Sequence, residues 1–334
     1  MIILCKPNRV ARSYLGGRRL DRMQGVAEPK DGFFPEEWVA STTRAFNMGG
    51  APDEGLSVTP DGRFLADILA EHPEYLGGFE RLPILLKLLD ASERLVIQAH
   101  PTVPFAKEHF GSPFGKAECW YILDADPDAH VYLGFKPLDD LRARWIRAFD
   151  AQNVQEMLSM LHRIPVKPGD VWYVDGGVPH AIGGGCIMAE LQEPTDLMVI
   201  PEKVTPSGRV LSEQKLHGGL GFEKMFDVFD YRGYSPEELR ARFHRRPDVP
   251  ANVPTPIIDG SLTEKFRLTE YRAEGKMTIP KPGQPAVAVV VSGSGEIGDS
   301  DGFFGISAGN SLFIPATAGA LTLRGSVRIL IAEP

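Results

Sequence analysis

One short apolar segment, LVIQAHP at positions 95–101, constrains the fold of this chain more than any other stretch. Its β-branched residues and closing proline predict a strand. Because residues two apart lie on the same face of a strand, Gln98 and His100 point to the same side. A glutamine oxygen beside an imidazole makes half of a metal site, so we expect two more donors on neighbouring strands. The chain offers them at Glu118 and His180.

Glu118 and His180 both lie in segments with strand character. Glu118 belongs to the apolar run at 116–123, and His180 follows the Pro-Gly-Asp turn at 168–170 and a second glycine turn. If the three strands are neighbours in a small barrel, all four donors converge, and Zn²⁺ accepts both imidazole nitrogen and carboxylate oxygen. Any one of these residues alone is better explained as a hydrogen-bonded core group. The set as a whole predicts one divalent ion, Zn²⁺, per chain.

The remainder of the chain predicts a mainly β protein. Its 35 glycines and 28 prolines suit many short strands joined by tight turns, and 334 residues suffice for two ordinary domains. Helical spacing occurs at about 60–75 and 137–162, so we expect helical insertions there, in the N-terminal half. Lys87 interrupts the buried strand predicted at 83–90, and its side chain either reaches out at an edge or faces a polar cavity.

Composition and charge exclude several classes of function. Net charge is −8 with a pI near 5.6, which disfavours nonspecific nucleic-acid binding. No apolar run approaches the length of a membrane span, and the N-terminal run at 2–5 is too short for a signal peptide. The cysteines, Cys5, Cys119 and Cys186, are scattered and odd in number. We therefore expect a cytoplasmic protein that binds neither nucleic acid nor membranes.

A proline-rich polar stretch at 246–256 predicts a boundary between two domains, 1–245 and 257–334. The first would hold the metal site. The second contains GNSLFIP from Gly309, which echoes GDVWYVD from Gly169. Eleven residues after these glycines stand Ala320 and His180, respectively. The C-terminal domain is therefore predicted to repeat the barrel in degenerate form, without a metal ligand.

Four segments together resemble the type I phosphomannose isomerases (mannose-6-phosphate isomerases) of the cupin superfamily. They are LVIQAHP, GKAECWYIL at 115–123, VKPGDVWYVDGGVPHAI at 166–182, and Glu190. The resemblance implies two cupin-like β-barrels of the jelly-roll type, with zinc at the four donors named above. It also implies an aldose–ketose isomerase that interconverts mannose 6-phosphate and fructose 6-phosphate.

The same resemblance implies roles for further residues. Lys116 matches an active-site lysine, and Glu190 matches the proposed acid/base residue. Asp196 matches an aspartate of the motif that follows, and Glu36, in the segment PEEW, would lie near the pocket. The chemistry moves a proton between C2 and C1 through an enediolate, which requires a base beside the carbon and positive charge beside the oxygen. Glu190 would be the base, and Zn²⁺ with Lys116 would hold the oxygens.

The chain departs from the family pattern at Ile200, where the family has an active-site arginine, and at Val96, where a small hydroxyl residue is common. Both changes remove polar groups from the region expected to hold the sugar phosphate. Lys87, Lys203 and Arg209 are the candidates for the missing cation. The sequence therefore leaves open an isomerase of another or an unphosphorylated sugar, or a sugar-binding protein without turnover.

Overall fold

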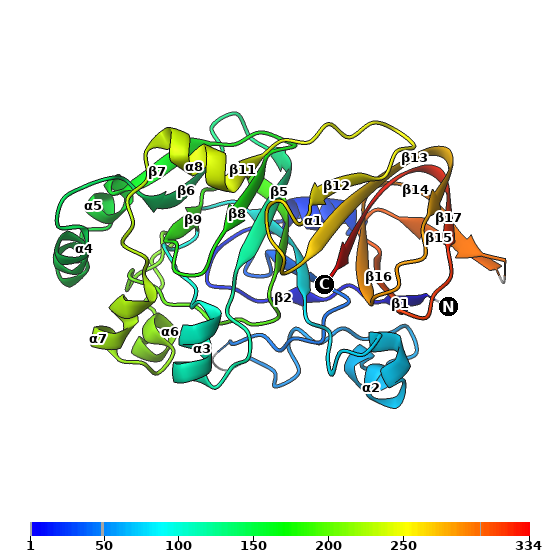
Figure 1. Ribbon diagram of the computed structural model, residues 1–334, viewed down its shortest axis with the longest axis horizontal. Helices are drawn as coiled ribbons and strands as arrows, with labels where there is room; N and C mark the ends of the chain where they lie inside the picture. Colours follow the sequence, from blue (N-terminus) through cyan, green and yellow to red (C-terminus); the bar gives the residue numbers. More distant parts are fainter. Residues whose placement is uncertain (1, 48–49, 301) are drawn as a thin grey trace.

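The computed structural model describes residues 2–47, 50–300 and 302–334, and the chain is mainly β, as predicted (Figure 1). Two sheets of seven strands each carry most of the chain, and a sheet of three strands lies beside them. We call them the C-terminal, central and small sheets.

The bounds of the elements are as follows. The C-terminal sheet contains β1 (Ile3–Cys5), β12 (Thr255–Ile258), β13 (Arg267–Ile279), β14 (Ala286–Asp299), β15 (Gly302–Ser307), β16 (Ser311–Ile314) and β17 (Leu321–Glu333). The central sheet contains β2 (Arg9–Val10), β3 (Glu36–Val39), β4 (Leu85–Ala91), β5 (Glu118–Ala125), β8 (Val171–Val174), β10 (Cys186–Gln192) and β11 (His244–Arg245). The small sheet contains β6 (His130–Phe135), β7 (Leu161–Pro165) and β9 (His180–Ile182). The helices are α1 (Arg18–Met23), α2 (Leu65–Glu71), η1 (Pro73–Leu76), α3 (Val103–Phe110), α4 (Leu141–Asp150), α5 (Val154–Ser159), α6 (Glu213–His217), α7 (Phe222–Met225), η2 (Phe226–Val228) and α8 (Pro236–Phe243).

The central and C-terminal sheets pack against each other over one shared core. Leu88 of β4 and Val289 of β14 belong to the same buried cluster. Polar contacts cross the same interface, since the Tyr121 hydroxyl of β5 donates to Glu270 of β13 at 2.7 Å, and Arg328 of β17 contacts Glu270 at 2.6 Å. One face of the central sheet is therefore used for core packing, which leaves the other face for a site.

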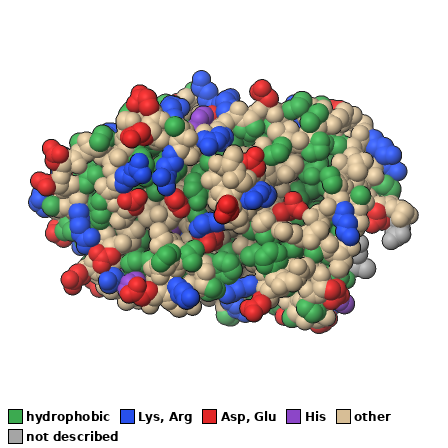
Figure 2. Space-filling view, in the orientation of Figure 1, with side chains coloured by type: hydrophobic (Ala, Val, Ile, Leu, Met, Phe, Trp, Pro, Cys, Tyr) green, Lys and Arg blue, Asp and Glu red, His purple; other side chains and the backbone are tan. Residues whose placement is uncertain are grey.

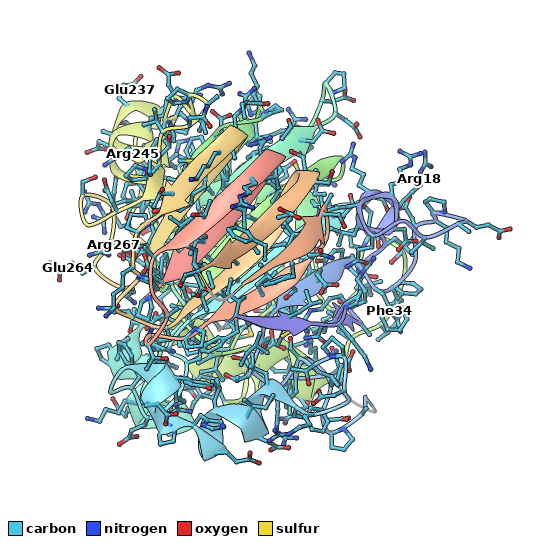
Figure 3. All side chains as sticks on the ribbon, turned by 90° about the vertical axis from the view of Figure 1, so that its right-hand side faces the viewer. Arg18, Phe34, Glu237, Arg245, Glu264 and Arg267 are labelled. Carbon is cyan, nitrogen blue, oxygen red and sulfur yellow. The ribbon has the colours of Figure 1, made fainter. Side chains whose placement is uncertain are left out.

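The two ends of the chain meet in the C-terminal sheet. Strand β1 pairs with β16, and β17 lies between β13 and β14. Figure 3 faces this sheet from outside, with Arg18 beyond one edge and Arg245 beyond the other. The N-terminal strand is thus part of the C-terminal layer, although the proline-rich boundary at 246–256 separates the two in sequence.

The sheets are open, and among the described residues they do not close into the two predicted barrels. The central sheet ends at β2 and β11, and the C-terminal sheet ends at β1 and β12. The prediction of a strand at 95–101 is also wrong, because Gln98 and Ala99 make only single bridges, to His180 and Val199. Consecutive residues of this segment bond to different parts of the chain and a proline follows at once, so no continuous ladder forms.

Helices lie in both regions where helical spacing was found. α2 and η1 occupy 65–76, and α4 and α5 lie within 137–162. The last residues of that second range, Leu161 and His162, begin β7 instead of continuing the helix. Leu161 is fully buried and pairs with Phe135 of β6, so burial in the small sheet outweighs the helical spacing.

The strand register gathers several polar side chains on the free face of the central sheet. β10 lies between β4 and β5, and Glu190 is directly opposite both Lys87 and Trp120. Two residues further along β10, Gln192 is opposite Glu118. Because directly opposed residues share a face, these side chains all point to the same side of the sheet.

The surface carries both signs of charge. Acidic and basic side chains are interspersed over the face seen in Figure 2, with apolar side chains between them. None of the helices in the described ranges has the length and apolar character that a bilayer crossing requires.

Glu37 of β3 is a fully buried carboxyl group that gives the fold a pH dependence. Its two oxygens accept hydrogen bonds from the Asn8 amide and from the Gln24 side chain, both at 2.7 Å. Burial raises the pKa of Glu37 from 4.5 to about 7, although both hydrogen bonds and the charge of Arg9 oppose this shift. At pH 6 the folded protein therefore holds a proton that the unfolded chain has released.

We expect the Glu37 contribution to stability to fall as pH rises through this window, because the folded state binds more protons than the unfolded state. The loss between pH 4 and pH 8 is about 3 kcal/mol. A Glu37→Gln variant, which has no such proton, should gain stability relative to the wild type as pH rises. Thermal unfolding of both proteins at a series of pH values measures the difference. A difference that stays constant with pH would contradict the assignment.

Candidate functional site

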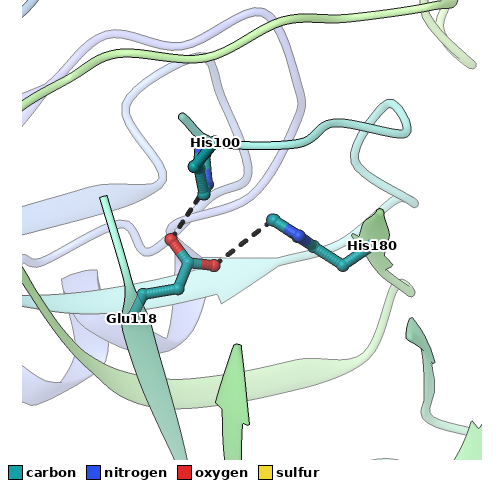
Figure 4. Close-up of side chains that lie close together, drawn as sticks. All are labelled: His100, Glu118 and His180. Atoms are coloured by element: carbon teal, nitrogen blue, oxygen red, sulfur yellow. Dashed lines mark ion pairs between the residues drawn. The ribbon is translucent and has the colours of Figure 1, made fainter. Parts of the chain in front are cut away.

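Three side chains predicted as metal ligands come together on the free face of the central sheet. His100 Nε2 lies 3.0 Å from one Glu118 oxygen, and His180 Nε2 lies 3.3 Å from the other (Figure 4). Each of the three residues offers one ligand atom, and these three atoms all lie within 4.8 Å of one another. All three side chains are buried, with exposed fractions of 0–1%.

Backbone contacts orient both imidazole rings. His100 Nδ1 lies 2.9 Å from the Leu197 carbonyl, and His180 Nδ1 lies 2.9 Å from the Val178 carbonyl. Each Nδ1 therefore donates, which leaves each Nε2 unprotonated and facing Glu118, although that of His100 accepts from Lys116. Burial, together with the charge of Lys116, lowers the pKa of His100 to about 3, and burial also lowers the pKa of His180. Both rings are thus neutral, which is the form that binds metals.

The buried polar atoms of this cluster fit a divalent cation. His180 Nε2 and one Glu118 oxygen have no hydrogen-bond partner among the described residues, and an unsatisfied buried group costs roughly 1–3 kcal/mol. The other Glu118 oxygen accepts from Trp120 Nε1 at 3.0 Å. Burial would raise the pKa of Glu118, but Lys116 and the two rings hold it well below its usual range. Two neutral imidazoles and one carboxylate are a common ligand set of zinc.

Lys116 and Gln98 stand next to the same three side chains. The Lys116 ammonium lies 2.8 Å from His100 Nε2 and 3.0 Å from Glu118, without hydrogen-bond geometry to that carboxylate. The main chains of Gln98 and His180 bond to each other in both directions at 2.9 Å. This bridge places the Gln98 side chain, which is 8% exposed, beside that of His180.

A second group of charges lies next to this cluster and contains Glu190. Lys87 Nζ donates to Glu190 at 3.0 Å and lies 3.8 Å from Glu36. Burial would lower the pKa of Lys87, but these two carboxylates outweigh it and raise the pKa, so the ammonium stays charged. Burial and the Glu118 charge raise the pKa of Glu190 despite its ion pair. Lys87 therefore faces a polar interior, which was one of the two alternatives that the sequence left open.

Arg12 connects the remaining carboxylates, and sequence reasoning missed it. Arg12 Nε lies 2.9 Å from Glu36, and its two terminal nitrogens bind both oxygens of Asp196 at 3.1 and 3.2 Å. Burial would raise the pKa values of Glu36 and Asp196, but Arg12 above all lowers them, that of Glu36 to about 2. Tyr14, also missed, donates to Glu36 at 2.9 Å. The sequence offered one indirect signal, which is that two buried carboxylates require a cation.

Shared contacts connect the cluster around Glu118 with the group of charges around Glu190. Trp120 donates to Glu118 and is opposite Glu190 in the sheet. On the other side, Asp196 binds Arg12, and its neighbour Leu197 accepts from the His100 ring. The candidate metal ligands and the candidate base therefore belong to one buried polar site.

A cavity of about 710 Å³ adjoins this site. Asp196 and Leu197 form part of its wall. Other parts come from 42–46, from 80–82 and from the helices α2, α3 and α6, which lie along the lower edge of Figure 1. A volume of this size is typical of small-molecule sites. The cavity thus gives a ligand a place directly beside the polar cluster.

The structure also shows what surrounds the unusual Ile200. Ile200 is buried and packs with Val96 and Leu216 in one small apolar cluster, so both departures from the family pattern meet in space. Lys203 lies over the ring of Phe149 at 5.0 Å, and Arg209 lies over another aromatic ring at 4.3 Å. Neither cation is part of the cavity wall.

Comparison with known proteins points to one family. The chain is 29% identical over 277 residues to the probable mannose-6-phosphate isomerase GmuF of Bacillus subtilis, which covers 82% of each chain. It is 35% identical over 189 residues to the mannose-6-phosphate isomerase of Streptococcus mutans, which covers 54% of each. No protein-family model matches the chain.

Solved structures agree on the fold. The mannose 6-phosphate isomerase of Bacillus subtilis superposes with a TM-score of 0.75 and 22% identity, over 100% of this chain and 99% of the other. A mannose 6-phosphate isomerase bound with zinc and yttrium superposes with a TM-score of 0.72 and 14% identity, over 99% of each chain. By sequence over most of its length and by fold throughout, the chain is similar to mannose-6-phosphate isomerases.

Proposed function

We propose that this protein is a metal-dependent aldose–ketose isomerase that interconverts mannose 6-phosphate and fructose 6-phosphate. The names of its relatives support this reading. The observation that carries it is the buried cluster of His100, Glu118 and His180 beside the ion pair of Lys87 and Glu190. An enzyme that moves a proton between adjacent carbons needs such a base next to a source of positive charge.

His100, Glu118 and His180 would hold one Zn²⁺ per chain, with Gln98 as a fourth, neutral donor. Two observations support this set: the orphaned atoms on Glu118 and His180, and the backbone contacts that direct both Nε2 atoms inward. The bound ion would supply positive charge beside the oxygens at C1 and C2, where negative charge develops.

Glu190 would remove the proton from one of these carbons and return it to the other. Its raised pKa suits this role, because a base works best when its pKa lies near the working pH. Lys87 fixes the orientation of the Glu190 carboxylate through their 3.0 Å contact. The Lys116 ammonium would add positive charge next to the sugar oxygens.

Glu36 and Asp196 are better placed to hold the site together than to react. Arg12 binds both of them, and the pKa of each carboxyl group is lowered, so each stays ionised and poorly basic. We assign them, with Arg12, to the wall that positions Lys87 and closes the end of the cavity.

We also propose that the chain consists of two cupin-like units, 1–245 and 257–334, in a reducing, cytoplasmic compartment. The repeated segments support this division, since β8 and β16 each start two residues after a glycine with positive φ, Gly169 and Gly309. His180 begins β9 in the first unit, whereas Ala320 occupies the matching position in the second. The buried, free state of all three cysteines fits a reducing compartment.

Isomerisation of mannose 6-phosphate, measured in both directions with the zinc-loaded protein, tests the proposed function. We expect turnover with the phosphorylated sugar and much slower turnover with plain mannose. Turnover of plain mannose alone would make the protein an isomerase of an unphosphorylated sugar. Tight binding of either sugar without turnover would make it a binding protein.

A further inference from the structure

The cavity beside the candidate metal ligands is lined by positively charged side chains. Lys215 of α6 lines it together with Arg44 and Arg81. Among the described residues, no carboxylate lies within 4.0 Å of any of these cations, as an ion pair would require. The same wall contains two carboxylates, Asp196, which Arg12 already binds at both oxygens, and Glu80, so the three cations still outnumber the carboxylates that remain. An anionic ligand in this cavity would therefore be attracted by the positive charge of its wall.

Lys215 is partly buried in the wall, whereas Arg44 and Arg81 are exposed. Its ammonium donates to the Phe46 carbonyl at 2.9 Å, which leaves further N–H groups for a ligand. Burial lowers the pKa of Lys215, and Arg12 and Lys116 act in the same direction, while Asp196 opposes them. A lysine held in such surroundings gains from a bound anion, because the anion replaces the water that burial removed.

A backbone hydrogen bond connects the segment of Lys215 to position 200, where the family pattern has an arginine. The amide of Ile200 donates to the Leu216 carbonyl at 2.7 Å, so position 200 is tied to α6. The Leu216 side chain packs against Ile200. Its neighbour Lys215 instead turns toward the cavity. Position 200 carries no positive charge, but Lys215, the residue before its hydrogen-bond partner Leu216, does.

We propose that Lys215, supported by Arg44 and Arg81, binds the phosphoryl group of the substrate and so determines the preference for a phosphorylated sugar. This inference rests on the proposed function, because it deals with the same site. The phosphoryl group would lie in the cavity, and the sugar would extend past Asp196 and Leu197 toward the metal cluster. Lys203 and Arg209 have no part in it, since their cations lie against aromatic rings elsewhere.

The arginines would hold the phosphoryl group from the outer side. The Arg44 guanidinium donates to the Pro52 carbonyl, and the Arg81 guanidinium lies 5.0 Å from the centre of the Phe114 ring. Both contacts fix the side chains and leave other N–H groups unused. Two guanidinium groups and one ammonium match the charge of a phosphate dianion better than a single lysine does.

The test compares Lys215→Gln with the wild type in zinc-loaded form. We expect the KM for mannose 6-phosphate to rise roughly 10- to 100-fold, the usual effect of losing a hydrogen bond to a charged group. The kcat should change much less, and zinc content and melting temperature should stay the same. The inhibition constant of inorganic phosphate should rise by a similar factor, and Lys215→Arg should restore most of the loss. Lys224→Gln is the matched control, because Lys224 is an exposed lysine outside the cavity that pairs with Asp227.

The results separate this inference from the proposed function. An active enzyme whose KM and phosphate inhibition are unchanged in Lys215→Gln, or change only in Lys203→Gln, refutes the inference alone. If the wild type does not isomerise mannose 6-phosphate, calorimetry with inorganic phosphate still tests the subsite, and binding that Lys215→Gln abolishes supports it. Absence of phosphate binding to the wild type refutes it. If Lys215→Gln does not fold, Arg81→Gln must raise the same two constants for the inference to stand.

Discussion

His100→Ala and His180→Ala proteins are expected to lose zinc and, with it, isomerase activity. The two imidazoles supply two of the three converging buried donors, and their Nε2 atoms face Glu118 at 3.0 and 3.3 Å. Loss of an outer partner of a metal ligand already costs roughly 10- to 100-fold in metal affinity, so loss of a ligand should cost more. Elemental analysis of the purified proteins measures this directly, with one zinc ion per chain expected for the wild type.

A matched control is His162→Gln. His162 is also a buried histidine, and its Nε2 lies 2.9 Å from the Tyr234 carbonyl, far from any carboxylate cluster. This variant should retain its zinc and its activity. Equal metal content in the wild type and in both alanine variants would show that the ion binds elsewhere or not at all.

A Glu190→Gln protein is expected to keep its zinc and its fold but to lose turnover by roughly 100-fold or more, the scale of a lost general base. The amide can still accept a hydrogen bond from Lys87 but cannot take up a proton. Steady-state kinetics with mannose 6-phosphate measures the loss in kcat.

Glu193→Gln is the matched control, because Glu193 is a nearby buried carboxylate that contacts the Ala117 amide and Lys265 instead of the site. Near-normal turnover in Glu190→Gln would show that Glu190 is not the base.

The pH profile of kcat adds a second readout for Glu190. The base must be ionised to act, so the rate should rise with pH through the pKa of Glu190, which burial and Glu118 raise. Replacing Lys87 with methionine removes the cation that favours the ionised form, and the rising limb should therefore move to higher pH. An unchanged rising limb in that variant would show that another group governs it.

The convergence of His100, Glu118 and His180 could be predicted because each lies in a short local pattern. Gln98 and His100 are two residues apart, and the Pro-Gly-Asp turn before His180 marks the start of a strand. The structure nevertheless holds Gln98 and Ala99 by single bridges rather than by a strand. The local pattern thus predicted that His100 and His180 lie close together, even though it predicted the wrong backbone conformation for the segment.

The cations of the site could not be predicted, because tertiary contacts decide which of them lie there. Arg12 binds Asp196 across 184 positions of sequence, and nothing near Arg12 indicates a carboxylate partner. Of the three cations that the sequence offers as substitutes for an arginine at position 200, Lys203 and Arg209 follow Ile200 closely in sequence. The structure instead brings Lys215 close, through the hydrogen bond between Ile200 and Leu216. Sequence proximity is a poor guide when a loop folds back on a helix.

The pairing of β1 with β16 has a consequence for how the protein is made. Cys5 of β1 is in register with Ser311, whose hydroxyl also accepts from the Ala40 amide at 2.8 Å. On the ribosome, β1 is synthesised long before β16, and it has no partner in this sheet until β16 exists. Contacts this distant in sequence slow folding, because the long loop between them must close first. During that time β1 is an unpaired strand, which can pair with other chains and so favours aggregation.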